Sequence, residues 1–290
     1  MLLALLKTMR PKQWVKNVFV FVGIFFDGAV TNLAKLTNSI LAFVIFSMVS
    51  SAIYLINDLV DIEKDRLHPV KRNRPLASGA LSPSVARAAA VVLLLIALPS
   101  AFLLHPWFGF FVALYAIVTI AYSFWLKNIV ILDVMSIAAG FVLRVAAGAA
   151  VVQVTRFSPW LYVCTTLGAL FIGISKRRNE LLLLAENANG HRASLQDYNR
   201  ALLDDMTALV TSTALAAYCF YTFSAPNLPA NHAMMLTIPF VIYGIFRYQY
   251  LVRVRNLGGA PEELVLGDRP LLLVLVLFAL VAALVIYLPF

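Results

Sequence analysis

The sequence has few charged residues. Only 13% of its 290 residues are Asp, Glu, Lys or Arg, whereas 62% are hydrophobic and the mean hydropathy is +0.87. This composition excludes an ordinary soluble globular protein and requires a membrane as solvent. Cysteine is also scarce: Cys164 and Cys219 lie in separate apolar runs, so we expect two small core residues and no disulfide or metal site.

Apolar runs of about twenty residues, the length needed to cross a bilayer as a helix, recur along the chain. They predict an all-α integral membrane protein with nine transmembrane helices. No low-complexity linker divides the chain, so residues 1–290 are expected to form a single polytopic membrane domain. The expected spans are residues 14–30, 38–57, 86–104, 107–125, 129–151, 159–175, 205–223, 234–252 and 270–288.

The basic residues are distributed unevenly between the two sides of the expected bundle. With a cytoplasmic N-terminus, the nine spans place all Lys and Arg residues on the cytoplasmic side except Lys35, Arg144 and Arg156. The positive-inside rule therefore predicts a multi-pass protein of the inner (cytoplasmic) membrane, with its N-terminus cytoplasmic and its C-terminus outside. The net charge of +9 is not gathered in a tail or stripe, so no nucleic-acid partner is expected.

The most informative stretch follows the second span and reads NDLVDIEKDRLHPVKRNR. Helical spacing places its first Asn and its three Asp residues on one face, whereas Glu63 lies well away from that face. Carboxylates so close repel one another unless a cation lies between them, and oxygen ligands suit Mg²⁺. The alternative is a solvated loop of mixed charge. The predicted metal ligands are Asn57, Asp58, Asp61 and Asp65.

Basic and amide side chains surround this motif in the sequence. Because Mg²⁺ prefers one or two carboxylates plus substrate phosphates, these side chains indicate a polyphosphate ligand. Directly after the motif come Arg66, Lys71, Arg72 and Arg74, and the stretch RPKQWVKN projects Gln13, Lys16 and Asn17 onto the same side of the membrane.

The loop after the sixth span begins SKRRNEL. Its Lys176 and Glu180 are four residues apart, so they can pair and direct the ammonium group toward a ligand. Arg177 points elsewhere and could hold a second phosphate. Positive-inside anchoring alone would also explain these basic residues, and both interpretations stay open.

The fifth span contains a second polar pattern. Asp133, Gly140, Arg144 and Gly148 lie on one stripe of the helix, with Arg144 about 16 Å deeper than Asp133. An arginine inside the membrane usually faces a polar partner or cavity, and the glycines permit close helix packing. We expect a structural or cavity-lining role for Arg144, with neutralisation of an anionic headgroup as the alternative.

Several segments together carry a family resemblance. They are RPKQWVKN (10–17), YLINDLVDIEKDRLHPVKRNRPLASG (54–79), SKRRNEL (175–181), IPFVIYGIFRY (238–248) and PEELVLGDR (261–269). With nine expected helices, this set resembles the UbiA-type intramembrane prenyltransferase superfamily, and within it the decaprenyl-phosphate phosphoribosyltransferases. The chain departs from ordinary prenyltransferases because the loop after the sixth span has no second Asp-rich motif.

The resemblance implies a helical bundle with its active site on the cytoplasmic side. It implies a transferase that uses Mg²⁺, phosphoribosyl pyrophosphate as donor and a polyprenyl phosphate as acceptor, in the synthesis of lipid-linked arabinose precursors of cell-envelope glycans. Asp58 and Asp61 would be catalytic, and Lys127 or Arg247 would meet the 5-phosphate or the lipid phosphate. The residues expected to clamp the donor phosphates are Lys16, Arg66, Lys71, Arg72, Lys176 and Arg177.

Two other functions remain open at this stage. One is transfer of a prenyl group from its pyrophosphate to an aromatic or other small acceptor. The other is a membrane transporter, which the crowding of polar residues on one side of the membrane disfavours. Formation of a homo-oligomer through lipid-facing helices is also open.

Overall fold

The computed structural model describes residues 1–67, 71–154, 158–186 and 193–288. Arg156 and Arg192, which contribute to the predicted charge distribution, lie outside these ranges. Every regular element among the described residues is helical. The long helices are α3 (Leu33–Val60), α5 (Pro83–Leu104), α6 (Pro106–Phe124), α7 (Leu132–Val152), α8 (Pro159–Glu186), α9 (Arg200–Ser224), α10 (Ile238–Arg253) and α12 (Arg269–Tyr287). The short ones are α1 (Leu2–Met9), η1 (Pro11–Phe21), α2 (Val22–Phe26), α4 (Ile62–Leu67), η2 (Lys71–Asn73), η3 (Leu126–Asn128), η4 (Ala193–Gln196), η5 (Ala233–Thr237) and α11 (Pro261–Gly267).

Seven helices among the described residues are long and apolar enough to cross a bilayer. They correspond to α3, α5, α6, α7, α9, η5 with α10, and α12. The expected span 159–175 lies within α8, which is 28 residues long. The protein is therefore an all-α integral membrane protein, as predicted, whereas the count of nine spans stays a prediction.

The first expected span, residues 14–30, differs from a regular membrane helix. It runs through η1, an eleven-residue 3₁₀ helix, and then through the short α2. Runs of 3₁₀ helix longer than about four residues are uncommon because their hydrogen-bond geometry is poorer. The sequence favours this departure locally: Pro11 begins the element, and the β-branched and aromatic residues that follow are weak α-helix formers.

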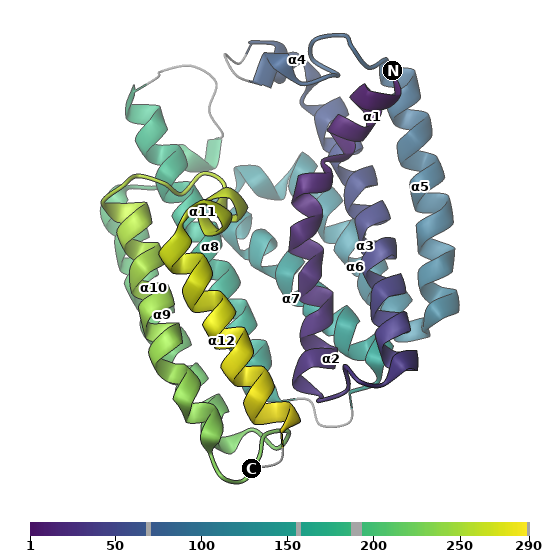
Figure 1. The fold of residues 1–290 in the computed structure, drawn as a ribbon. Helices are drawn as coiled ribbons and strands as arrows, with labels where there is room; N and C mark the ends of the chain where they lie inside the picture. Colours follow the sequence, from purple (N-terminus) through teal and green to yellow (C-terminus); the bar gives the residue numbers. More distant parts are fainter. Residues whose placement is uncertain (68–70, 155–157, 187–192, 289–290) are drawn as a thin grey trace.

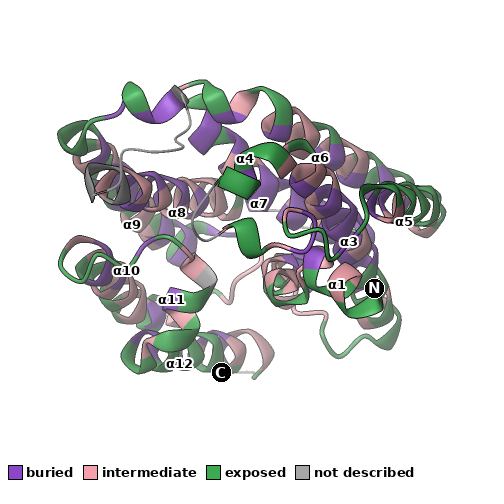
Figure 2. Cartoon of the chain, turned by 90° about the horizontal axis from the view of Figure 1, so that it is seen from above, coloured by how far each residue is buried: buried purple, intermediate pink, exposed green. Residues whose placement is uncertain are grey.

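The helices form a bundle in which α7 holds an inner position (Figures 1 and 2). It contacts η1, α2, α3, α6 and α8, and half or more of its apolar span is buried. The two termini lie at opposite ends of the bundle; α1 and α4 lie at the N-terminal end, and α11 lies toward the same end but apart from them, next to α12 (Figures 1 and 2). The acidic motif, residues 57–65, therefore lies at the N-terminal end of the bundle.

Glycine permits the close contacts that η1 and α2 make with α7. A β-carbon at Gly148 would overlap with the carbonyl oxygen of Val20, and one at Gly23 would come 2.9 Å from the α-carbon of Ala149. A side chain at Gly140 would make only ordinary contacts. The predicted close packing is thus confirmed for Gly148, and it seats η1 against the inner helix.

Candidate active site

The end of α3 carries the acidic motif to the N-terminal end of the bundle. The amide of Asp61 donates to the carbonyl of Asn57 (3.0 Å), and the amide of Asp65 donates to the carbonyl of Asp61 (2.8 Å). The backbone therefore keeps helical spacing through the junction of α3 and α4. Asn57 is partly exposed, whereas Asp58 and Asp65 are buried.

Asp58 and Asp65 converge on one guanidinium group. Arg74 Nη1 lies 3.2 Å from Asp58 Oδ1 and 2.6 Å from Asp65 Oδ2, and the two carboxylate side chains are 2% and 5% exposed. Arg10 Nη2 lies 2.5 Å from the same Asp58 oxygen, and its guanidinium group stacks over the Tyr54 ring. Two buried carboxylates that share a cation in this way have the charge and spacing to bind a metal ion in its place.

Asp61 faces a different cation. Lys127 Nζ lies 2.8 Å from Asp61 Oδ1 and 3.1 Å from Asp61 Oδ2, so one ammonium group bonds both oxygens. Lys127 belongs to η3, which joins α6 to α7, and its side chain is only 9% exposed. The structure thus joins two predicted site residues that are far apart in the sequence.

The fit of Mg²⁺ to this motif rests on Asp58 and Asp65. Among the residues that the structure describes, no three His, Cys, Asp or Glu side chains come together in the manner of a metal site. Mg²⁺ is usually held by one or two carboxylates with substrate phosphates completing its octahedron, so a converging pair of buried carboxylates fits it. Asn57 and Asp61 stay predicted ligands, Asp61 being engaged with Lys127 in this state.

Asn17 lies away from the acidic motif, in a buried polar cluster between helices. Arg144 Nε donates to Asn17 Oδ1 (2.9 Å), Nη1 donates to the Gly140 carbonyl (2.7 Å) and Nη2 donates to the Tyr115 hydroxyl (2.7 Å). The side-chain amide of Asn17 donates in turn to the hydroxyls of two serines of α3, Ser47 and Ser50, at 3.1 and 3.2 Å. Arg144 therefore has the structural role that we expected, and Asn17 ties η1 to α3 and α7.

The other predicted binding residues of the N-terminal half lie at the surface around the motif. Lys16 Nζ donates to Gln13 Oε1 at 2.5 Å, and both residues are partly exposed. Arg66 bonds the exposed Glu63 at 2.8 Å. Two further predicted residues, Lys71 and Arg72, lie in η2, directly before Arg74.

In the C-terminal half, Arg247 pairs with Asp268 through two bonds of 3.1 and 2.7 Å. Asp268 also caps α12, because its carboxylate accepts from the amide of Leu271 (2.9 Å). The hydrogen bonds from Arg247 hold the pKa of Asp268 below its ordinary value. Lys176, in α8, is partly exposed.

Arg177 is engaged within the protein rather than directed toward solvent. Its side chain is fully buried, Nε lies 2.7 Å from Asp133 Oδ2, and Nη2 donates to the hydroxyl of Tyr122 (2.9 Å). Nη1 bonds the carboxylate of Glu180. In this conformation Nη1 and Nη2 of Arg177 are hydrogen-bonded and Nε is ion-paired with Asp133 without a hydrogen bond, so the predicted contact of Arg177 with a phosphate would require these contacts to open.

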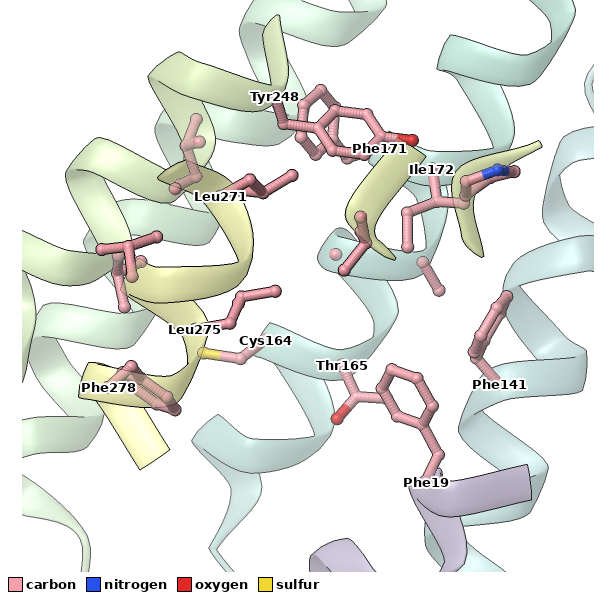
Figure 3. A pocket seen from close by; sticks show the side chains of 18 of the residues that line it. Phe19, Phe141, Cys164, Thr165, Phe171, Ile172, Tyr248, Leu271, Leu275 and Phe278 are labelled. Carbon is pink, nitrogen blue, oxygen red and sulfur yellow. The ribbon is translucent and has the colours of Figure 1, made fainter. Parts of the chain in front are cut away.

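An apolar groove of about 530 Å³ lies next to the site. In Figure 3, Phe19 of η1 and Phe141 of α7 line one side, and Leu275 and Phe278 of α12 line the other. Lys16 is the charged residue among those that line the groove. The groove has the lining expected for a hydrocarbon chain, with an ammonium group next to it.

Comparison with known proteins identifies the family to which this architecture belongs. The family model described as the UbiA prenyltransferase family matches residues 17–265. The chain belongs to the UbiA prenyltransferase family.

The chain is similar to named proteins and to solved structures of this family. Over 97% of its length, the chain is 33% identical to the decaprenyl-phosphate phosphoribosyltransferase of Mycobacterium tuberculosis, of which the match covers 94%. The protein of the same name from Corynebacterium glutamicum is 32% identical over 92% of this chain and 82% of its own length. The structure of a UbiA homolog from Archaeoglobus fulgidus bound to DMAPP and Mg²⁺ aligns with a TM-score of 0.76 over 98% of this chain and 99% of that one, at 19% identity, and thus shares the UbiA fold.

Two residues of this UbiA family member, Arg10 and Asp133, were not singled out as site residues from the sequence. Arg10 touches Asp58, and its only sequence signal was its place at the start of RPKQWVKN. Asp133 was recognised as a polar residue of the fifth span, but its contacts with Arg177 and Tyr198 come from other helices and loops. No spacing within one helix can indicate such contacts.

Proposed function

We propose that the protein transfers the 5-phosphoribosyl group of phosphoribosyl pyrophosphate to a polyprenyl phosphate and releases pyrophosphate. The observation that carries this proposal is the similarity of nearly the whole chain to decaprenyl-phosphate phosphoribosyltransferases. The acidic motif at one end of the bundle and the adjoining apolar groove supply the two kinds of binding surface that such a reaction needs.

The donor pyrophosphate would bind at Asp58 and Asp65. These residues would hold Mg²⁺ together with the donor, and Mg²⁺ would supply neutralisation of the charge that develops on the leaving pyrophosphate. Arg10 and Arg74, which bond these carboxylates in the described state, are then free to donate to phosphate oxygens. Lys127 would contribute from the side of Asp61.

The lipid acceptor would place its hydrocarbon chain in the groove and its phosphate near Lys16. The groove is lined almost wholly by apolar side chains, so it suits a polyprenyl chain that enters from the bilayer. The ammonium group of Lys16 lies beside the groove and suits an anionic headgroup. This arrangement brings the lipid phosphate to the end of the bundle where the acidic motif lies.

The chemistry then requires little acid or base catalysis. The lipid phosphate is already anionic, so its oxygen needs no strong general base to attack ribose C1. A bond from this oxygen to C1 forms while the bond from C1 to the pyrophosphate oxygen breaks, and pyrophosphate leaves with that electron pair. The main barrier is the repulsion between the two anions, and the surrounding cations lower it by neutralising their charge. We expect direct displacement with inversion at C1, and a product that retains the donor's anomeric configuration would contradict this step.

Orientation in the membrane follows from the basic residues. We expect the end of the bundle that carries α1, α4 and α11 to face the cytoplasm, where the donor is soluble, because most Lys and Arg residues lie in the segments predicted for that side. The outer end would then carry the C-terminus.

The proposal is tested with purified protein in detergent, a polyprenyl phosphate, Mg²⁺ and labelled phosphoribosyl pyrophosphate. We expect label to enter the lipid phase only when Mg²⁺ is present, and Asp58→Asn to abolish the transfer. Glu63→Gln is the matched control, because Glu63 lies in the same motif, is 77% exposed and bonds Arg66 only at the surface. Absence of label from the lipid, together with consumption of a prenyl pyrophosphate and an aromatic acceptor, would favour ordinary prenyl transfer instead.

A further inference from the structure

A buried polar cluster lies directly behind the turn that carries Lys127. Its centre is Asp133, in the first turn of α7, whose side chain is fully buried. The hydroxyl of Tyr198 donates to Asp133 Oδ1 (2.8 Å), and Arg177 Nε lies 2.7 Å from Asp133 Oδ2. This buried carboxylate is thus fully engaged by partners from α8 and from the segment before α9, and it lies outside the donor contacts described above.

The same segment also holds the backbone of the Lys127 turn. Ser194 Oγ donates to the carbonyl oxygen of Lys127 (2.9 Å), and the amide of Ile131 donates to the hydroxyl of Tyr198 (2.8 Å). Ser194 and Tyr198 are almost fully buried, at 0% and 4% exposed. Two hydrogen bonds, one donated by Ser194 and one accepted by Tyr198, therefore hold residues 127–131 at both ends.

Ile131 supplies an independent indication that this turn is held under constraint. Its φ is 71° and its ψ is −49°, a conformation that a β-branched residue rarely adopts. Such a conformation is energetically costly and persists only where neighbouring contacts enforce it, often at functional sites. The hydroxyl of Tyr198 bonds the amide of this very residue.

The turn ends in the contact with the acidic motif. Lys127 Nζ bonds both oxygens of Asp61, so the position of the Lys127 backbone fixes where this ammonium group can reach. Burial, with the adjoining Asp133 carboxylate, raises the pKa of Tyr198 to about 12, so its hydroxyl keeps its proton at neutral pH.

We propose that Ser194, Tyr198 and Asp133 form a positioning clamp that sets Lys127 for contact with the donor pyrophosphate. The clamp joins the end of the loop between α8 and α9 to the acidic motif through a single turn. Ser194 and Tyr198 are positioning residues, since each acts through Lys127 and not through the substrate. This inference rests on the proposed function only in that a pyrophosphate group binds at Asp61 and Lys127, whichever group it carries.

A double-mutant cycle with inorganic pyrophosphate tests the clamp. Binding of pyrophosphate in Mg²⁺ to the purified full-length protein would be measured by calorimetry for the wild type, Tyr198→Phe, Lys127→Met and the double variant. We expect Tyr198→Phe to weaken binding about tenfold, the effect of one misplaced charge-assisted contact. In the Lys127→Met background the same change should have no further effect, because residues that act through one another are not additive.

Tyr162→Phe is the matched control, because Tyr162 is an exposed tyrosine of α8 and should leave binding unchanged. Hydrogen exchange provides a second readout: Tyr198→Phe should speed exchange of the Ile131 amide, and amides of α12 should keep their rates. If Tyr198→Phe does not fold, Ser194→Ala takes its place in the same cycle, since it removes only the bond to the Lys127 carbonyl and a weak contact with Asp133.

The other outcomes distinguish failure of the clamp from failure of the proposed donor. Equal weakening by Tyr198→Phe with and without Lys127 would show that the tyrosine acts by another route, and unchanged binding would show that the clamp does not position Lys127. A Lys127→Met variant that binds pyrophosphate normally would overturn the clamp and the place of Lys127 in the site. Coupling in the cycle without phosphoribosyl transfer to lipid would retain the clamp and reject the proposed donor.

Discussion

Replacing Gly168 with leucine should impair use of the lipid acceptor and leave binding of the donor unchanged. Gly168 lies in α8 and lines the apolar groove, and a β-carbon added there has no heavy atom within 4 Å. A leucine side chain can therefore extend into the groove without displacing its own helix, which leucine also favours over glycine. The substitution changes the space for a hydrocarbon chain and no polar group of the site.

The expected magnitude follows from what the displaced part of the lipid loses. Leucine adds four carbon atoms, and about 0.8 kcal/mol per methylene group would give about 3 kcal/mol if the displaced chain entered water. The chain instead enters detergent or lipid, which is as apolar as the groove, so this figure is an upper bound. Overpacking of a filled apolar site costs about 1–3 kcal/mol, which corresponds to roughly 5- to 150-fold in kcat/KM for the acceptor.

Steady-state kinetics with acceptors of two lengths provide the assay. We expect Gly168→Leu to lower kcat/KM for a long polyprenyl phosphate, to have little effect with an acceptor too short to reach Gly168, and to leave the KM for phosphoribosyl pyrophosphate unchanged. Gly168→Ala, which adds one carbon atom to open space, should resemble the wild type. An equal loss with long and short acceptors would refute the assignment of the groove to the lipid chain.

Three further predictions concern contacts that hold the bundle. Gly148→Ala would press a methyl group against a backbone carbonyl of η1, so it should lower the midpoint of thermal unfolding in detergent, whereas Gly140→Ala should not. Arg144→Met removes three buried hydrogen bonds, leaving Asn17 Oδ1 and the Tyr115 hydroxyl without the Arg144 donor, and should destabilise the protein by about 2 kcal/mol, measured by denaturant unfolding. Asp268 has a folded-state pKa below its ordinary value of 3.8, so its ion pair stabilises the protein above about pH 4 and is lost as the pH falls further. Asp268→Asn should therefore lower the unfolding midpoint at pH 7, and this effect should shrink progressively as the pH falls below 4.

The sequence pattern predicted the features that depend on neighbouring residues along the chain, namely the helices and the spacing within them. Apolar runs gave the helices, and the spacing of Asn57 to Asp65 correctly indicated helical backbone through the motif. The 3₁₀ geometry of η1 was not predicted, because hydropathy reports burial in lipid and does not distinguish an α-helix from a tighter one. The glycine that accommodates η1 was recognised, but its partner Val20 lies on another element.

The polar contacts of the site were harder to predict because they join distant segments. Spacing within the loop indicated Lys176 as a partner of Glu180, which stays a prediction. It did not indicate the bond from Arg177 to Glu180 or the ion pair of Arg177 with Asp133, over forty residues away. Lys127 and Asp61 were both predicted site residues, yet nothing in their spacing indicated that they meet. Helical periodicity orders the residues of one helix, whereas only packing determines which faces of different helices oppose each other.

The most direct test of the central claim offers the purified protein both possible donors at once. Phosphoribosyl pyrophosphate and a prenyl pyrophosphate would be supplied with Mg²⁺, a polyprenyl phosphate and an aromatic acceptor, and the lipid products would be identified by mass spectrometry. We predict a polyprenyl phosphate that has gained one phosphoribosyl group, with one pyrophosphate released for each lipid formed. A prenylated aromatic product, with the polyprenyl phosphate unchanged, would contradict the account.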